Sequence, residues 1–325
     1  MEFTFLGTSA GVPCKHRNVT SLALKPDTGK YWYMVDCGEA TQHQLLHTPF
    51  SVQSLKAIFI THVHGDHCYG LPGILASASM SGRKKTLVIV GPKEIEDFVK
   101  GVQKATHLWL DFELIFVDVV KAISKGDLID FIDVKVEPFE LSHRVPCFGY
   151  NFIEGKVQPQ LDKNKLIAEG IKPGPIWGQL QKGIDAKDSD GITLKAKDYF
   201  LPPRDSRVVA VCGDNDDPKL VALVAHKPHV LLHEATYTID IAQKVGAGPQ
   251  HSWAQLVGQF AQDYGLAHLV LTHFSARFVD ASSKAGLSIG DIRAEATDVY
   301  DGKLFLARDF ETYRLDKDFN LSVLS

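Results

Sequence analysis

Three histidines and an aspartate fall within six residues in the segment His62-Val63-His64-Gly65-Asp66-His67. The apolar run before it, residues 57–61, predicts a buried strand. Imidazole nitrogens and carboxylate oxygens are ligands that zinc prefers. The first two histidines, two residues apart in an extended turn, can face one point, and the aspartate and third histidine can face a second. An ordinary polar loop is the alternative, but the pattern is rare by chance, so it predicts a metal site at a strand end.

Short apolar runs separated by turn residues recur along the chain. Several are rich in Val, Ile and Phe, which is typical of strands buried on both faces. Helical periodicity lies between some of them, and in the helix expected over 252–264 Ser252 is the expected N-cap and Gly265 the stop. The pattern predicts an α/β fold of two sheets packed face to face with helices outside. The expected strands are 2–6, 20–24, 31–36, 57–61, 86–90, 112–117, 133–138, 147–153, 208–212, 230–233, 269–272 and 304–307, and the other expected helices are 41–46, 71–80, 92–106 and 218–225.

Three further candidate ligands also follow apolar runs: His143, Asp214 and His273. Loops at strand ends converge at one edge of a sheet, so we expect these side chains near the 62–67 segment. Either histidine alone would more often be structural, but the recurrence after strands favours ligation. Asp214 has two oxygens and can bridge two ions. The expected sets are therefore His62, His64, His143 and Asp214 for one metal, and Asp66, His67, His273 and Asp214 for the other.

Composition narrows the class of protein. The 325-residue chain is 45% hydrophobic and 23% charged, close to the globular average, which excludes disorder, collagen and coiled coil. No apolar run reaches the roughly 18 residues of a membrane span, and the N-terminal segment lacks the features of a signal peptide. The net charge of −4 excludes a globally basic nucleic-acid binder but not a local basic surface. Five scattered cysteines favour a reducing compartment, and we expect a cytoplasmic protein.

One segment, 155–198, departs from the α/β pattern. It has two glycine–proline clusters and little apolar periodicity, and its eight lysines and six acidic residues give a local net charge of +2. A solvated loop is one interpretation, but a long excursion inside a compact domain is often functional. We therefore expect a single domain over 1–325 with a flexible, protruding arm inserted over 155–198.

The 62–67 segment, followed by single ligands after later strands, resembles the metallo-β-lactamase superfamily, whose fold is a four-layer αβ/βα sandwich. Finer motifs resemble the ribonuclease Z family, the tRNA 3′-processing endonucleases, in its short form. These motifs are the opening Phe5-Leu6-Gly7-Thr8-Ser9-Ala10-Gly11-Val12-Pro13, the PxKxRN loop Pro13–Asn18, the segment Asp36-Cys37-Gly38-Glu39-Ala40-Thr41-Gln42 with Ala40 for glycine, the Gly170–Gly183 arm motif, the HEAT motif His233-Glu234-Ala235-Thr236, and the last loop Thr272-His273-Phe274-Ser275-Ala276-Arg277.

The resemblance implies a zinc-dependent endoribonuclease that removes the 3′ trailer from precursor tRNA. Two zinc ions per subunit, for which manganese or iron could substitute, would activate a water and neutralise phosphate charge. Because no 2′-hydroxyl attacks, the products would carry 3′-hydroxyl and 5′-phosphate ends. Asp66 would also orient the water or accept its proton. His251, held by Glu234, would protonate the leaving oxygen, because a carboxylate raises the pKa of a histidine and fixes its tautomer.

The resemblance also implies how the substrate is held. The family acts as a homodimer in which the arm of one subunit clamps the tRNA that the other subunit cuts. Lys15, Arg17 and Asn18 would lie near the 3′ end and influence where the cut falls or whether a CCA end is tolerated. The remaining expected substrate contacts are Arg277 and, in the arm, Lys172, Pro173, Gly174, Pro175, Gly178 and Lys182.

Two motifs depart from the family pattern. The HST segment reads His251-Ser252-Trp253, and the segment at Asp214 continues with Asn215 where threonine is usual. We expect His43 to contact a metal ligand without binding the metal itself. The role of His233 stays open. Two other functions stay open as well. One is another hydrolase of this fold, such as an arylsulfatase, lactonase or small-molecule phosphodiesterase, which would not need the arm. The other is an inactive RNA-binding subunit, which the complete ligand set disfavours.

Overall fold

The computed structural model describes residues 1–155, 157, 159–279 and 286–324. The chain divides into two compact units, one made of Met1–Glu154 with Arg207–Ser325 and the other of Gly155–Ser206. The expected arm over 155–198 falls within the second unit, which runs on to residue 206. Each unit is described by itself.

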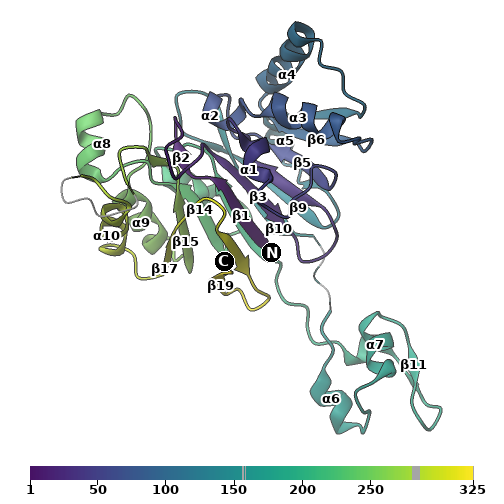
Figure 1. Ribbon diagram of the computed structural model, residues 1–325. Coiled ribbons are helices and arrows are strands. Elements are labelled where there is room, and N and C mark those ends of the chain that lie inside the picture. Colours follow the sequence, from purple (N-terminus) through teal and green to yellow (C-terminus); the bar gives the residue numbers. More distant parts are fainter. Residues whose placement is uncertain (156, 158, 280–285, 325) are drawn as a thin grey trace. The chain divides into compact units, whose positions relative to one another are not determined.

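Two sheets form the frame of the first unit (Figure 1). The first sheet has eight strands in the order β19-β18-β1-β3-β4-β5-β6-β7, and the second has seven in the order β17-β15-β14-β13-β10-β9-β8. The strands of the first sheet are β1 (Glu2–Gly7), β3 (Ser21–Lys25), β4 (Trp32–Val35), β5 (Leu55–Phe59), β6 (Leu87–Gly91), β7 (Leu114–Asp118), β18 (Thr312–Leu315) and β19 (Leu321–Val323). Those of the second are β8 (Ile129–Asp130), β9 (Val134–Leu141), β10 (Cys147–Glu154), β13 (Val208–Cys212), β14 (Val230–Glu234), β15 (His268–Thr272) and β17 (Lys303–Leu306). A separate parallel pair joins β2 (Ser9–Ala10) to β16 (Phe274–Ser275).

The core lies in three layers because successive strand residues face opposite sides of a sheet. Leu232 packs between the two sheets, whereas its neighbour Leu231 packs outward under the helices. The first sheet is covered on its outer face by α3 and α4, and the second by α9 and α10 (Figure 1). The helices are α1 (Thr41–Leu45), α2 (Gly65–Cys68), α3 (Leu71–Met80), α4 (Lys93–Thr106), α5 (Val119–Lys125), α8 (Ile239–Val245), α9 (Ala254–Asp263) and α10 (Ile289–Thr297), with a 3₁₀ helix η2 (Pro218–Leu223). These four layers confirm the predicted αβ/βα sandwich.

Every expected strand is present, with ends shifted by three residues at most. Two expectations about helices were wrong. Residues 218–223 form a 3₁₀ helix rather than an α-helix, and Ser252 does not cap α9. Trp253 stands at the N-cap of α9, while the Ser252 hydroxyl donates to the carbonyl of Asn215 at 2.6 Å. None of the helices in the described ranges combines the length and apolar character needed to cross a membrane.

The second unit has a small core of its own. Its elements are α6 (Lys163–Ala168), α7 (Pro175–Gln181), β11 (Ala186–Lys187), β12 (Thr193–Leu194) and the 3₁₀ helix η1 (Ala196–Tyr199). Asp162 caps α6 by accepting from the backbone of Lys165, and Pro175 occupies the first turn of α7, where no backbone donor is needed. Leu166 and Leu180, both fully buried, pack with their neighbours between these elements. The segment is therefore a folded module and not a solvated loop.

Candidate active site

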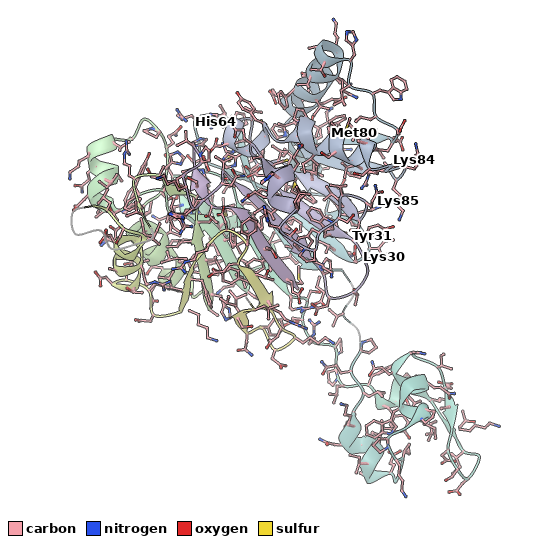
Figure 2. All side chains as sticks on the ribbon, viewed as in Figure 1. Lys30, Tyr31, His64, Met80, Lys84 and Lys85 are labelled. Atoms are coloured by element: carbon pink, nitrogen blue, oxygen red, sulfur yellow. The ribbon has the colours of Figure 1, made fainter. Side chains whose placement is uncertain are left out.

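The seven expected metal ligands converge from segments that follow four strands, β5, β9, β13 and β15, with Asp66 and His67 in the short helix α2. The ligand atoms of His62, His64, His143 and Asp214 lie within 4.8 Å of one another, and those of Asp66, His67 and His273 form a second group by the same measure. The structure thus brings together both predicted sets. Figure 2 labels His64, which belongs to the first set and is half-buried.

Asp214 lies between the two sets and turns one oxygen toward each. Its Oδ2 is 3.6 Å from His62 Nε2 and 3.7 Å from His143 Nε2. Its Oδ1 is 3.4 Å from His67 Nε2 and 3.2 Å from His273 Nε2. The predicted bridging role of Asp214 therefore has the geometry that it needs.

The donor chemistry fits divalent metal ions. Ring nitrogens approach one another closely, with His62 Nε2 3.0 Å and His143 Nε2 3.2 Å from His64 Nδ1. In the second set, His67 Nε2 lies 3.3 Å from His273 Nε2. Lone pairs of neutral imidazoles that face each other at this distance repel, and a shared cation relieves that repulsion. Imidazole-rich sets with carboxylates suit zinc, manganese or iron.

The opposite nitrogen of most ligand histidines is held by a neighbour, as is usual around metals. His67 Nδ1 contacts Asp36 Oδ2 at 2.7 Å. His143 Nδ1 donates to the carbonyl of Gln250 at 2.8 Å. His273 Nδ1 lies 3.0 Å from the Thr236 hydroxyl. These contacts fix the rings with their free nitrogens directed into the site.

Asp36 is the orienting residue that sequence reasoning missed. Besides His67, its carboxylate accepts from the backbone and hydroxyl of Thr61. Asp36 adopts a left-handed φ of 58°, and His273 one of 57°. Such strain in residues other than glycine concentrates at functional sites. The expectation that His43 supports the ligands was wrong, because its side chain is exposed and packs against His47.

His251 and Glu234 form the predicted pair beside the ligands. His251 Nδ1 lies 2.9 Å from Glu234 Oε1 and 3.8 Å from Asp214 Oδ2. Burial lowers the pKa of the His251 imidazole, but the carboxylates of Glu234 and Asp214 together outweigh this effect and the pKa rises to about 9. Burial in turn raises the pKa of Glu234, but His251 holds that pKa below its usual value. This imidazolium–carboxylate pair is therefore ready to donate a proton at neutral pH.

Asn215 and His233 tie the ligand loops together. The Asn215 side-chain amide donates to His233 Nε2 at 2.9 Å, and its oxygen accepts from the backbone of Ser142 at 3.0 Å. The Asn215 backbone donates to Glu234 at 2.9 Å. Burial lowers the pKa of His233, which donates through Nδ1 to the carbonyl of Glu234. His233 is thus a neutral structural group, and Asn215 fills the place of the usual threonine with every polar atom engaged.

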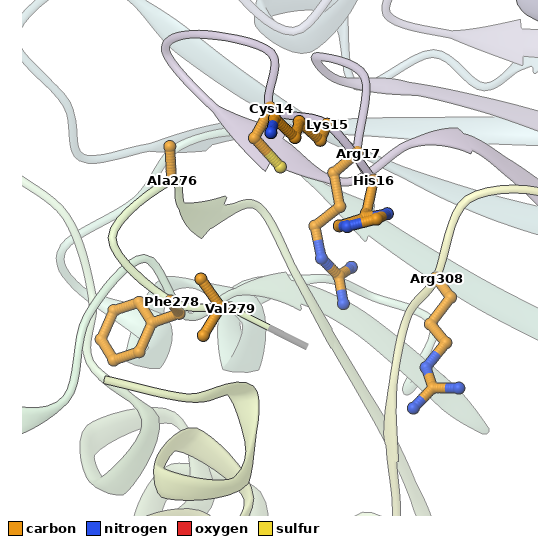
Figure 3. A pocket seen from close by; sticks show the side chains of 8 residues that line it. All are labelled: Cys14, Lys15, His16, Arg17, Ala276, Phe278, Val279 and Arg308. Carbon is orange, nitrogen blue, oxygen red and sulfur yellow. The ribbon is translucent and has the colours of Figure 1, made fainter. Parts of the chain in front are cut away.

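A cavity lies beside the loop that carries the PxKxRN motif (Figure 3). The cavity measures about 630 Å³, and its lining includes Lys15, Arg17 and Arg308. Arg17 is buried and donates to Thr8 and to the carbonyl of Ala307, both at 2.7 Å. It therefore holds the loop in place, which makes it a weaker candidate for direct RNA contact than exposed Lys15.

The other expected substrate residues are placed as follows. Asn18 is half-buried and donates to the carbonyl of Glu39 at 2.8 Å. Arg277 is exposed and its guanidinium faces the Tyr237 phenol. Burial raises the pKa of Tyr237, and Arg277 offsets only part of that rise. The six expected contact residues of the second unit are all exposed, namely Lys172, Pro173, Gly174, Pro175, Gly178 and Lys182.

The sandwich and its site define a class of protein. The metallo-β-lactamase fold protein YhfI from Bacillus subtilis matches with a TM-score of 0.63 at 17% identity, over 96% of this chain and 98% of that chain. A family model described as the anti-Pycsar protein Apyc1 matches residues 1–157, less than half of the chain. The class is a protein of the metallo-β-lactamase fold whose strand ends carry side chains suited to hold metal ions.

Full-length relatives narrow the class. A protein named ribonuclease Z from Marinobacter nauticus is 50% identical over 99% of this chain and 98% of its own length. The crystal structure of human tRNase Z, short form, matches with a TM-score of 0.60 at 25% identity, over 97% of this chain and 100% of that chain. The chain belongs to the ribonuclease Z family, and the resemblance predicted from the motifs is confirmed.

Proposed function

We propose that this member of the ribonuclease Z family is an endoribonuclease that removes the 3′ trailer from precursor tRNA with two metal ions, preferably zinc. Family membership supports the tRNA substrate. The observation that carries the two-metal part is the position of Asp214, which turns one oxygen toward each of two histidine sets. A small-molecule hydrolase of this fold would use the same ligands, but it would leave the lysine-bearing second unit without a role.

Metal ions held by the two sets would lower the pKa of a bound water and neutralise charge on the scissile phosphate. Asp66 contacts His67 and His273 at 3.4 Å and accepts from the backbone of Gly11 at 2.7 Å. Its fixed carboxylate would orient the attacking water or accept the proton that this water loses.

His251 carries the proton that the leaving group needs. The bond that breaks joins phosphorus to the 3′-oxygen of the last retained nucleotide, and this oxygen leaves with a proton from the His251 ring. Glu234 keeps the imidazole protonated and fixes its orientation through Nδ1. Water supplies the new oxygen on phosphorus, so the trailer keeps a 5′-phosphate and the tRNA a 3′-hydroxyl.

Substrate binding falls to the exposed lysines of the second unit, including Lys172 and Lys182, and to Lys15 and Arg277 near the site. Lysines on such a surface bind the phosphate backbone without reading sequence. We place the enzyme as a homodimer in which one subunit holds the tRNA that the other cuts. All five cysteines are free, which supports a reducing compartment such as the cytoplasm.

The test is cleavage of a precursor tRNA with a 3′ extension, with both product ends mapped. One cut at the acceptor stem that leaves a 3′-hydroxyl and a 5′-phosphate is expected. A 2′,3′-cyclic phosphate would mean that the ribose attacks and would refute the water mechanism. No cut by a metal-loaded protein would shift the function to a small-molecule hydrolase.

A further inference from the structure

A hollow next to His251 is not used by the mechanism described so far. It measures about 310 Å³ and lies between the 237–250 segment, which contains α8 (Figure 1), and the start of α9. Its wall includes Tyr237, Trp253, Gln243 and Gln250, with His251 at one side. The Tyr237 and His251 rings meet edge to face at 5.9 Å.

The lining of this hollow selects the chemistry of its occupant. Among the described residues that line it there is no lysine or arginine, and its acidic or basic side chains are Asp216 and His251, the second of which is already paired with Glu234. It offers two half-buried aromatic side chains, Tyr237 and Trp253, and amides on Gln243 and Gln250. Flat aromatic surfaces with a few hydrogen-bonding groups suit a nucleobase, which stacks and pairs at its edge. The volume is at the lower end of ligand pockets, about 300–1,000 Å³, which suits one nucleoside.

The position of His251 selects which nucleotide enters. In the proposed mechanism, His251 protonates the 3′-oxygen of the last retained nucleotide, so the ribose of that nucleotide lies against the imidazole. The hollow opens on the same imidazole and can take the base attached to that ribose. Trp253, which departs from the HST pattern, stands in its wall. The carbonyl of Gln250, from the same wall, holds His143 at 2.8 Å, so the hollow is fixed to the metal ligands.

We propose that this hollow binds the base of the nucleotide immediately 5′ of the cut, with Trp253 and Tyr237 as stacking residues that position the cut. The inference rests on the proposed function and on the role given to His251. Binding of this one base beside His251 would then determine which phosphodiester bond is cut.

The experiment compares single-turnover cleavage of two precursor tRNAs by the metal-loaded enzyme. One is intact and the other has an abasic ribose immediately 5′ of the cut. The variants are Trp253→Ala, Trp253→Phe and, as a matched control, Trp109→Ala, whose side chain is 82% exposed in the loop after α4. Loss of one base–aromatic stack should slow cleavage of the intact substrate by Trp253→Ala roughly 5- to 150-fold. The Phe variant keeps most of the rate, and the control variant keeps all of it.

The abasic substrate makes the test specific. In the wild type it should be cut more slowly than the intact substrate by a similar factor, and Trp253→Ala should barely distinguish the two. The dissociation constant of the cut tRNA, measured by fluorescence anisotropy, should rise with Trp253→Ala and stay unchanged with the control. Metal content and the unfolding temperature of each variant report whether it is folded. The comparison of the intact and abasic substrates with wild-type enzyme does not depend on any variant.

Several results would overturn the inference. One is that the wild-type enzyme cuts the abasic and intact substrates at the same rate. Another is that Trp253→Ala slows cleavage of both substrates equally. A dominant effect of an abasic site on the trailer side would assign the hollow to the other product. All three leave the proposed function intact. If wild-type enzyme cuts neither substrate, the proposed function fails, and the inference fails with it.

Discussion

Asp36 shows how a residue outside the ligand set controls it. Its carboxylate holds His67 Nδ1 at 2.7 Å and also fixes Thr61, next to His62. Partners of this kind orient ligand rings and raise their basicity.

We expect Asp36→Asn to weaken metal binding by about 10- to 100-fold, because an amide no longer holds the ring with a full negative charge. A competition titration against a chromogenic chelator measures the change. Asp111→Asn, at an exposed acid, is the control. Equal affinities for the two variants would show that Asp36 does not support the site.

Glu234 and His251 give the reaction a defined dependence on pH. The acid must be protonated to act, so its contribution is present below its pKa and is lost as pH rises through about 9. Glu234→Gln removes the charge that raises this pKa, so the decline in rate should begin at lower pH. His251→Ala should slow cleavage by about 10²- to 10⁴-fold with metal content unchanged. A variant that loses metal would identify His251 as a ligand.

The candidate ligands could be grouped from the sequence because they lie in segments that follow strands, and strand ends meet at one edge of a sheet. Asp36, Thr236 and Asn215 were not predictable as supporting residues. Their roles depend on contacts with residues 31, 37 and 18 positions away along the chain. Asp36 belongs to the Asp-Cys-Gly-Glu motif, which marks it as a residue of interest. The motif does not indicate that Asp36 contacts His67.

At the scale of elements, the two residues of the first unit that flank the inserted segment are bound to each other. The guanidinium of buried Arg207 donates to the Glu154 carboxylate at 3.0 and 2.8 Å and to Asp27 at 2.7 Å. The backbone of Glu154 also donates to the carbonyl of Arg207 at 2.9 Å. The two ends of the inserted segment therefore start from adjacent, fixed points, and a few residues can bridge them.

This geometry permits removal of the whole second unit, which contains the arm. Replacing residues 155–206 by a short glycine–serine linker should raise KM for precursor tRNA and reduce its dependence on salt, since phosphate contacts are lost. Hydrolysis of a small phosphodiester should stay nearly unchanged. Lys172→Glu with Lys182→Glu should move KM in the same direction within a folded arm. Equal loss on both substrates would mean that the unit supports the site rather than the tRNA.

The arm was recognised from its motif and charge, but its own fold was not. Its apolar residues, such as Leu166 and Leu180, are few and irregularly spaced, so no helical or strand period marks them. The short strands β18 and β19 were missed for a related reason. β18 pairs with β1, which lies some 300 residues earlier, and β19 pairs with β18 at the edge of the sheet. The residues of both strands give no long apolar run.

At the scale of the whole molecule, the proposed homodimer predicts complementation. A variant without the arm and a His64→Ala variant should each be nearly inactive on precursor tRNA. When the two variants are mixed and exchange subunits, about half of the dimers contain one subunit of each kind. Each mixed dimer pairs one intact site with the partner's arm, so the mixture should regain up to roughly a quarter of wild-type activity. Activity that stays at the level of the separate variants would mean that each subunit uses its own arm.

The central claim is that seven side chains hold two metal ions and that both are needed for the cut. The direct measurement titrates metal-free enzyme with zinc while recording bound metal by native mass spectrometry and cleavage of a 3′-extended tRNA in single turnover. We predict that activity appears as the second ion binds and that chelation abolishes it. Full activity with one ion per chain, or cleavage that persists without metal, would contradict the account.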